Sequence, residues 1–200
     1  MGARGGRRAR RSAAATGIAR ARALSLAATG LFYRATPQIV AATVWGATAA
    51  CVLLIWLNSG ARRFVADVGL RGLIALHLVR FVGIAFVGLY LAGRFPFSFG
   101  VVGGVGDIVI ATGAVILLYR YSRAFTIVWS VAGLIDILSV VAMAFREGVR
   151  DPESMAPLRA FPLMLLPTFF VPLIIVSHGV ILVRLFGKAY AQKTAIHPIR

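Results

Sequence analysis

The sequence is poor in cysteine and in acidic residues. Its single cysteine, Cys51, lies inside an apolar run, so an intrachain disulfide is excluded. Only six of the 200 residues are Asp or Glu, against 22 Lys and Arg, which leaves a net charge of +16. A chain with so few charges that is also 60% hydrophobic is not an ordinary soluble domain.

Sequence signatures of soluble enzymes are missing as well. The chain has no Walker loop, no dinucleotide-binding fingerprint between a strand and a helix, and no Cys/His spacing typical of zinc sites. The sequence therefore assigns no catalytic residue and no metal ligand, and it favours a protein that is not an enzyme.

Five apolar stretches are long enough to cross a hydrocarbon core of about 30 Å as helices. They predict an all-α fold, a polytopic membrane protein built as a bundle of about five transmembrane helices. Three prolines in the last stretch predict a bend in its first half. The predicted spans are residues 37–57, 70–92, 100–119, 124–145 and 158–186.

Basic tails flank the predicted bundle. Residues 1–36 contain eight arginines and no acid, and they predict a partly disordered or interfacial tail; residues 188–200 form a shorter basic tail. Such a tail suits anionic lipid headgroups or the acidic loops of a partner protein, and not nucleic acid, because its charge is attached to a membrane bundle. A targeting segment and a mis-assigned start remain as alternatives.

The third stretch carries one charge, Asp107, on a helix face made of small residues. Small side chains let helix backbones approach closely in lipid, where the hydrophobic effect does not drive helices together. A carboxylate facing lipid costs several kcal/mol, so we expect Asp107 to point inward toward a partner. The small residues that share its face at helical spacing are Gly100, Gly104, Ala111 and Ala114.

Ionisable residues of the other spans lie at comparable depths. With a rise of about 1.5 Å per residue, Arg80, Asp107 and Asp136 fall in one layer near the middle of the membrane. His77 and His178 share a layer nearer the face at which the second span begins. Because buried charges usually pair, we expect Arg80 to pair with Asp107, Asp136 or both, which would fix the helix register.

Three other interpretations of these residues stay open. The carboxylates and histidines could form an ion or proton path. Gly104-Val-Gly-Asp107 matches the Gly-x-Gly-Asp of intramembrane aspartyl proteases, with Asp136 as the second carboxylate, although in those proteases this motif carries the second aspartate along the chain. Finally, His77 and His178 could ligate haem b, or each could hydrogen-bond a neighbouring helix. No other cofactor is indicated.

Four segments from residue 77 onward carry a resemblance to a known family: residues 77–83 (HLVRFVG), 104–107 (GVGD), 133–136 (GLID), and 167–172 (PTFFVP) with His178. Over roughly its last two-thirds the chain resembles an uncharacterised family of bacterial multi-pass membrane proteins. The resemblance implies a multi-pass fold and a location in a bacterial inner (cytoplasmic) membrane but no activity, and it leaves out the basic N-terminal tail.

The short connections between the predicted spans leave little soluble surface for a substrate pocket. This organisation favours an accessory or scaffolding subunit of a larger membrane complex, of photosynthetic or respiratory type, in contact with other membrane subunits. A small transporter or proton-path protein is the alternative, and it would use Asp107, Asp136 and Arg80.

Overall fold

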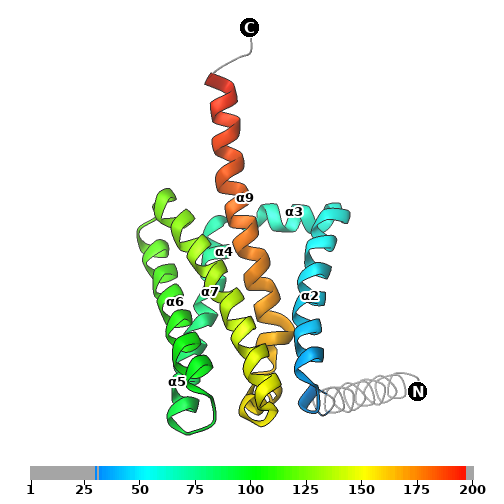
Figure 1. Ribbon diagram of the computed structural model, residues 1–200. Helices are drawn as coiled ribbons and strands as arrows, with labels where there is room; N and C mark the ends of the chain where they lie inside the picture. The colour runs from blue at the N-terminus through cyan, green and yellow to red at the C-terminus, as the bar shows by residue number, and fades with distance from the viewer. Residues whose placement is uncertain (1–29, 31, 197–200) are drawn as a thin grey trace, which may run out of the picture.

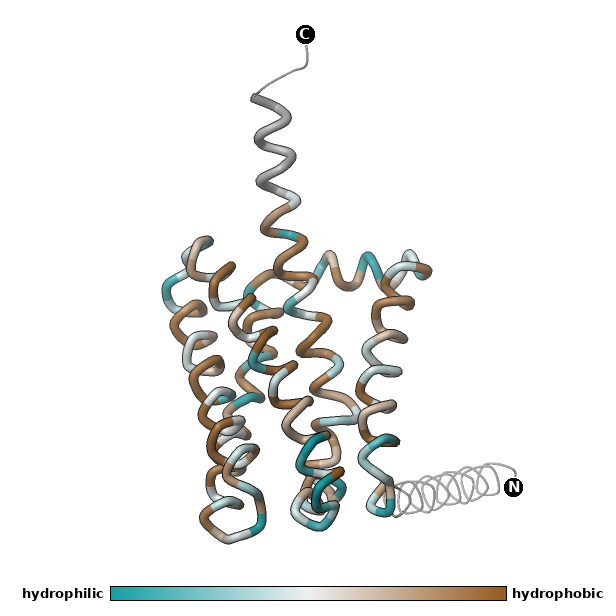
Figure 2. Tube along the Cα trace, viewed as in Figure 1, coloured by the Kyte–Doolittle hydropathy of each residue, from teal (hydrophilic) through white to brown (hydrophobic). Residues whose placement is uncertain are grey.

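The computed structural model describes residue 30 and residues 32–196, which are all-α and contain no strand. Five helical segments are long and apolar enough to cross a membrane, and they run alternately up and down in Figure 1. Hydrophobic residues follow their length, and hydrophilic residues gather toward the ends (Figure 2). The predicted all-α, polytopic fold is confirmed. The segments are Pro37–Leu57, Leu70–Leu91, Ser98–Tyr119, Arg123–Arg150 and Leu166–Gly187.

The first span is helix α2 (Pro37–Leu57). The hydroxyl of Thr36 caps its start by accepting a hydrogen bond from the amide of Ile39. Pro37 suits the first helical position, where an amide N–H would have no partner within the helix. We call the end of the bundle where α2 begins the lower end, and the end where it finishes the upper end, as drawn in Figure 1.

A short helix, α3 (Ser59–Asp67), runs across the upper end of the bundle after α2 (Figure 1). The side chain of Asn58 caps it by accepting hydrogen bonds from the amides of Gly60 and Ala61. The predicted spans leave this segment as a connection. Its polar sequence is too short to cross a membrane but suits the membrane surface.

The second span consists of three helical pieces: α4 (Leu70–Leu76), the 3-10 segment η1 (His77–Val82) and α5 (Gly83–Leu91). Residues three apart lie directly above one another in a 3-10 helix, so His77 and Arg80 face the same direction. The sequence pattern predicts one regular helix here. No proline or glycine interrupts residues 77–82, so contacts with other helices are the physical reason for the tighter winding.

The third span begins with a π-helical turn, η2 (Ser98–Gly103), and continues as α6 (Gly104–Tyr119). The fourth span, α7 (Arg123–Arg150), begins at the capping hydroxyl of Ser122 and extends past the predicted end at residue 145. It continues through polar residues because nothing in them breaks a helix before Pro152.

The connection to the fifth span holds η3 (Pro152–Met155) and α8 (Ala156–Arg159). The fifth span starts with a π-helical turn, η4 (Leu166–Phe170), and becomes the regular helix α9 (Val171–Ile196).

Two of the fifth span's predicted features differ from the structure. The predicted start at residue 158 and the bend after it are replaced by a turn region before Leu166, because Pro162 interrupts the helix instead of kinking it. Helix α9 also runs on into the range predicted as a C-terminal tail. Residues 1–29, 31 and 197–200 lie outside the described residues, and so do most of the predictions made for the basic tail.

Two hydrophobic clusters fill the bundle, one toward each end. Ile74, Leu117 and Trp129 belong to the upper cluster, and Phe86 and Val140 to the lower one. In the second to fifth spans, the buried polar residues except Thr126 come between those of the two clusters along the chain. The polar side chains therefore form a layer enclosed by apolar packing above and below.

Candidate functional site

Arg80 connects the second, third and fourth spans. Its Nε donates to Oδ1 of Asp107 at 2.6 Å, its Nη1 donates to the carbonyl oxygen of Gly133 at 3.1 Å, and its Nη2 donates to Oδ2 of Asp136. The side chains of Arg80 and Asp107 are only 1% and 5% exposed, and that of Asp136 is 23% exposed. Two carboxylates thus neutralise one buried guanidinium, which fixes the relative register of three helices.

The small face of the third span lies against the second span. Gly100 lies close to the side chain of Tyr90, and Gly104 lies close to the carbonyl oxygen of Gly83. Further along the same face, Ala111 and Ala114 are completely buried. The close approach of these helices brings the 3-10 segment η1, and with it Arg80, next to Asp107.

His77 and His178 form a second buried group beside the ion pairs. Each shares a 3.0 Å hydrogen bond with a serine hydroxyl, His77 Nε2 with Ser177 and His178 Nδ1 with Ser130. The two imidazole rings pack against each other with centroids 4.1 Å apart and planes tilted by 39°. Trp129 meets the ring of His77 edge-on at 4.9 Å.

Gly133 joins the two groups. Its carbonyl oxygen accepts from Arg80, while a Cβ at this position would lie 2.6 Å from both Cε1 and Nε2 of His178. Any larger residue would push the imidazole away, so the close contact requires glycine. We call the connected set the polar centre; it consists of Arg80, Asp107, Asp136, His77, His178, Ser130 and Ser177.

The geometry of the polar centre does not fit haem b. Axial imidazoles on opposite sides of an iron, each with a bond of about 2 Å, place their ring centroids about 6 Å apart with the porphyrin between them. The rings of His77 and His178 instead stack at 4.1 Å and leave no space for a macrocycle. Within the described residues, no three His, Cys, Asp or Glu side chains gather in a way that could hold a metal ion.

The two carboxylates also differ from an aspartyl protease dyad. Such a dyad shares one proton between adjacent carboxyl groups. Here Asp107 and Asp136 each bind a different nitrogen of Arg80, and the guanidinium takes the place of the shared proton. The arrangement resembles a structural ion-paired connection between helices more than a pair poised for acid–base chemistry.

Not every member of the site is predicted by the depth and charge of ionisable residues along the sequence. Ser130 and Ser177 are ordinary residues for an apolar helix, and their spacing from the nearest predicted site residues of their helices does not place them on one face with those residues. Ser177 directly precedes His178, and Ser130 lies six residues before Asp136 on the same helix, α7. Trp129 is held by a 2.8 Å hydrogen bond from its Nε1 to the carbonyl oxygen of Ile110.

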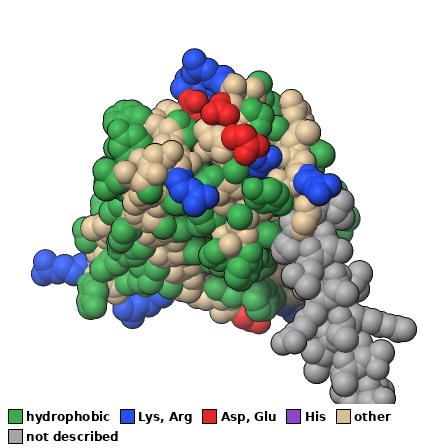
Figure 3. Space-filling view, turned by 90° about the horizontal axis from the view of Figure 1, so that it is seen from below, with side chains coloured by type: hydrophobic (Ala, Val, Ile, Leu, Met, Phe, Trp, Pro, Cys, Tyr) green, Lys and Arg blue, Asp and Glu red, His purple; other side chains and the backbone are tan. Residues whose placement is uncertain are grey.

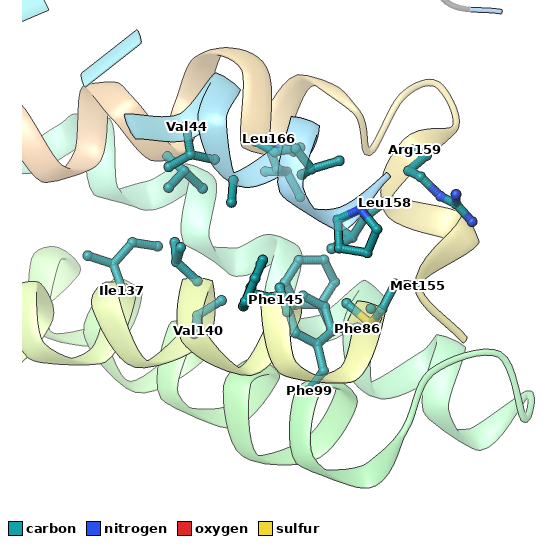
Figure 4. A pocket seen from close by; sticks show the side chains of 18 of the residues that line it. Val44, Phe86, Phe99, Ile137, Val140, Phe145, Met155, Leu158, Arg159 and Leu166 are labelled. Carbon is teal, nitrogen blue, oxygen red and sulfur yellow. The ribbon is translucent and has the colours of Figure 1, made fainter. Parts of the chain in front are cut away.

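A largely apolar pocket reaches the polar centre from the lower end of the bundle (Figure 4). The figure shows Val44 and Ile137 at one end and Arg159 at the other, with Phe86, Phe99 and Phe145 between them. Among its lining residues only Arg80, Asp107 and Arg159 carry a charge. An apolar wall with a few placed polar groups is typical of ligand sites.

The fold and the polar centre define a polytopic membrane protein with an ion-paired interior. Residues 35–186 match the family described as Domain of unknown function (DUF8737), and the chain belongs to this family. The match includes the first span, which the resemblance starting at His77 leaves out. No curated protein and no solved structure matches the chain.

Proposed function

We propose that the protein is a non-catalytic accessory or scaffolding subunit of a larger membrane complex of photosynthetic or respiratory type, in a bacterial inner membrane. The observation that carries the proposal is the exposure of α2. Only 11% of the residues in its most apolar window are buried within the chain, against 44% for the third span. A helix that buries so few of its residues inside its own bundle leaves much of its surface free for a neighbouring subunit.

Trp45 supports a protein neighbour for this helix. It lies about 12 Å along α2 from the helix start and is half-exposed, so its ring faces out at bilayer depth. Tryptophan favours the membrane interface, because its indole N–H needs an acceptor that hydrocarbon does not offer. A polar group on a neighbouring helix would supply that acceptor.

The polar centre supports a structural role. Both carboxylates bind Arg80, and each histidine binds a serine, so the described contacts hold helices together. The seven arginines among residues 1–29 would add charged contacts with anionic headgroups or with acidic loops of the partner.

The test is to solubilise membranes of the native host in mild detergent and to measure the mass of the particle that contains the protein. We expect a complex heavier than the 21.4 kDa protomer, with at least one other polypeptide in fixed ratio. Trp45→Phe, which removes only the indole N–H at bilayer depth, should weaken the complex. Trp56→Phe, at the end of the same helix, is the matched control and should leave it intact. A lone protomer in the wild type would overturn the proposal.

An ion or proton path is the second candidate, and one observation favours it: the pocket reaches Arg80 and Asp107 from the lower end. The test is reconstitution into liposomes that contain a pH-sensitive dye. Under an imposed potential, proton entry that Asp107→Asn abolishes would support a path, and wild-type leakage equal to that of empty liposomes would exclude it.

A further inference from the structure

The mouth of the pocket lies among helix ends. Pro37 at the start of α2, Gly148 near the end of α7, and Pro152 all line it. From Gly148 to Ile137 the pocket follows α7 for eleven residues, or about 16 Å of helix length. It therefore extends from the level of a lipid headgroup into the hydrocarbon layer, and it is a partly open pocket, not an enclosed cavity.

Arg159 is held at this mouth by backbone atoms. Its Nη1 donates to the carbonyl oxygen of Ala35 at 3.2 Å, and its Nη2 donates to that of Pro152 at 2.8 Å. Its side chain is only 13% exposed, and its buried Nε has no partner in the described part of the chain. A guanidinium has five N–H groups, so these two bonds leave donors free in a fixed orientation.

The charge of Arg159 is poorly neutralised. The nearest carboxylate, that of Glu153, lies 3.8 Å away on a side chain that is 85% exposed, and such a pair is weak. Figure 3 views this end of the bundle and shows acidic side chains next to one another, with separate basic ones around them. In the described residues, the loops and helix ends here hold a basic excess: Arg34, Arg94, Arg146, Arg150 and Arg159 against Glu147, Asp151 and Glu153.

We propose that the pocket binds one acyl chain of an anionic phospholipid whose phosphate lies against Arg159. The chain lies along the apolar walls made by α2, α7 and the start of the fifth span, and displaces no protein hydrogen bond. The free N–H groups of Arg159 donate to the phosphate oxygens in a charge-assisted interaction. The proposal does not depend on the protein's being a subunit of a complex, because either role leaves the pocket facing lipid.

Native mass spectrometry of the purified full chain tests the headgroup. The probes are phosphatidylglycerol and phosphatidylcholine with identical acyl chains. Both lipids carry a phosphate, but the choline cation of phosphatidylcholine compensates its own phosphate charge and is repelled by Arg159, whereas phosphatidylglycerol keeps a net negative charge. We therefore expect the wild type to retain phosphatidylglycerol about tenfold better, and Arg159→Gln to lose that preference. Arg150→Gln removes the same charge from the same end and should keep the preference. Equal retention of the two lipids by the wild type, or equal effects of the two variants, would overturn the proposal.

The acyl chain is tested separately. Val141→Trp fills the pocket from α7 and should reduce retention of both lipids several-fold. The matched control, Val128→Trp, changes a residue of the same helix that is 66% exposed to the surroundings of the bundle, and it should not. If inorganic phosphate alone displaced the bound lipid, whatever its acyl chain, the proposal would be contradicted.

A third measurement needs no variant. Phosphatidylglycerol with a photoreactive group in its acyl chain is bound to the wild type and activated with light. We expect cross-links to the residues of α7 that line the pocket along its length: Ile137, Val140, Val141, Ala144, Phe145 and Gly148. Cross-links confined to outward-facing residues such as Val128 would show an ordinary lipid shell and overturn the assignment.

Discussion

The backbones of Gly83 and Gly104 touch where the second span crosses the third. A Cβ added to Gly104 would lie 2.8 Å from the carbonyl oxygen of Gly83, and a Cβ added to Gly83 would collide with the carbonyl oxygen of Gly104. In lipid, such close crossings gain van der Waals contact that larger side chains would prevent. The crossing also places Arg80, three residues before Gly83, within reach of Asp107.

We predict that Gly83→Ala destabilises the bundle by about 1–3 kcal/mol, the usual cost of overpacking, despite the better helix propensity of alanine. Gly88→Ala in the same helix is the control, because nothing lies within 4 Å of a Cβ at that position. It should be neutral or slightly stabilising. Reversible unfolding in mixed detergent micelles measures both, and equal stability of the two variants would show that the crossing is looser than the structure has it.

A second prediction concerns the ion pairs of Arg80. Arg80→Leu leaves two carboxylates without their cation, one of them fully buried, and should lower the free energy of unfolding by about 3–5 kcal/mol. Neutralising the carboxylates as well, in R80L/D107N/D136N, should restore part of the loss. Arg146→Leu removes an exposed cation from a half-buried Glu147, which keeps its hydrogen bond from Ser98, and should change stability by less than about 1 kcal/mol. If the change in unfolding free energy of the triple variant equalled the sum of the changes of the three single variants, the three side chains would not act together.

The depth of these residues follows from the sequence, because the rise per residue of a helix is nearly constant. That arithmetic puts Arg80, Asp107 and Asp136 in one layer, and the structure brings the three side chains into contact. Rotation about the helix axis is harder to infer. The 3-10 segment that turns His77 and Arg80 to one side has no local sequence signal, since it is favoured by contacts with other spans.

Other features depend on how separate segments pack. The polar sequence of α3 predicts neither its length nor its course across the bundle, which depend on a cap at Asn58 and on contacts with Arg184. The pocket is lined by residues of all five spans and of the connection between the fourth and the fifth, so no local pattern contains it. For the same reason Ser130 and Ser177 are recognised only once the histidines they bind are in place.

A third prediction tests the serine partners of the histidines. Ser177→Ala removes the hydroxyl that binds Nε2 of His77 and leaves that buried nitrogen unsatisfied, at a cost of about 1–3 kcal/mol. Ser139→Ala removes an exposed hydroxyl that binds only its own helix, at the carbonyl oxygen of Ile135, and should cost less than about 0.5 kcal/mol. The same micelle unfolding assay compares them, and a neutral Ser177→Ala would contradict the hydrogen bond.

The stacking of the two histidines predicts the absence of a haem spectrum. When the protein is expressed with an excess of haem and purified, we expect neither a Soret band nor a reduced α-band that scales with protein. The reason is the 4.1 Å separation of the ring centroids, which leaves no room for a macrocycle between His77 and His178. A stoichiometric bis-histidine spectrum, lost in His178→Ala, would mean that the rings separate to admit haem and would overturn this part of the site.

The last prediction concerns the attachment of α3 to the bundle. Arg184 of α9 donates through Nη1 to the carbonyl oxygen of Val68 at 2.8 Å and through Nη2 to that of Val65. These carbonyls lie at the end of α3, so one guanidinium ties the surface helix to the fifth span, and lysine cannot reproduce both bonds. Arg184→Gln should therefore speed hydrogen exchange of amides in residues 59–69 by about tenfold, with little change elsewhere. Arg123→Gln is the matched control, because Arg123 donates to the carbonyl oxygen of Leu185 at the same end of the bundle and leaves α3 untouched. Hydrogen exchange is measured in detergent by mass spectrometry. If the amides of residues 59–69 exchanged in Arg184→Gln as they do in the wild type, contacts other than those of Arg184 would hold α3.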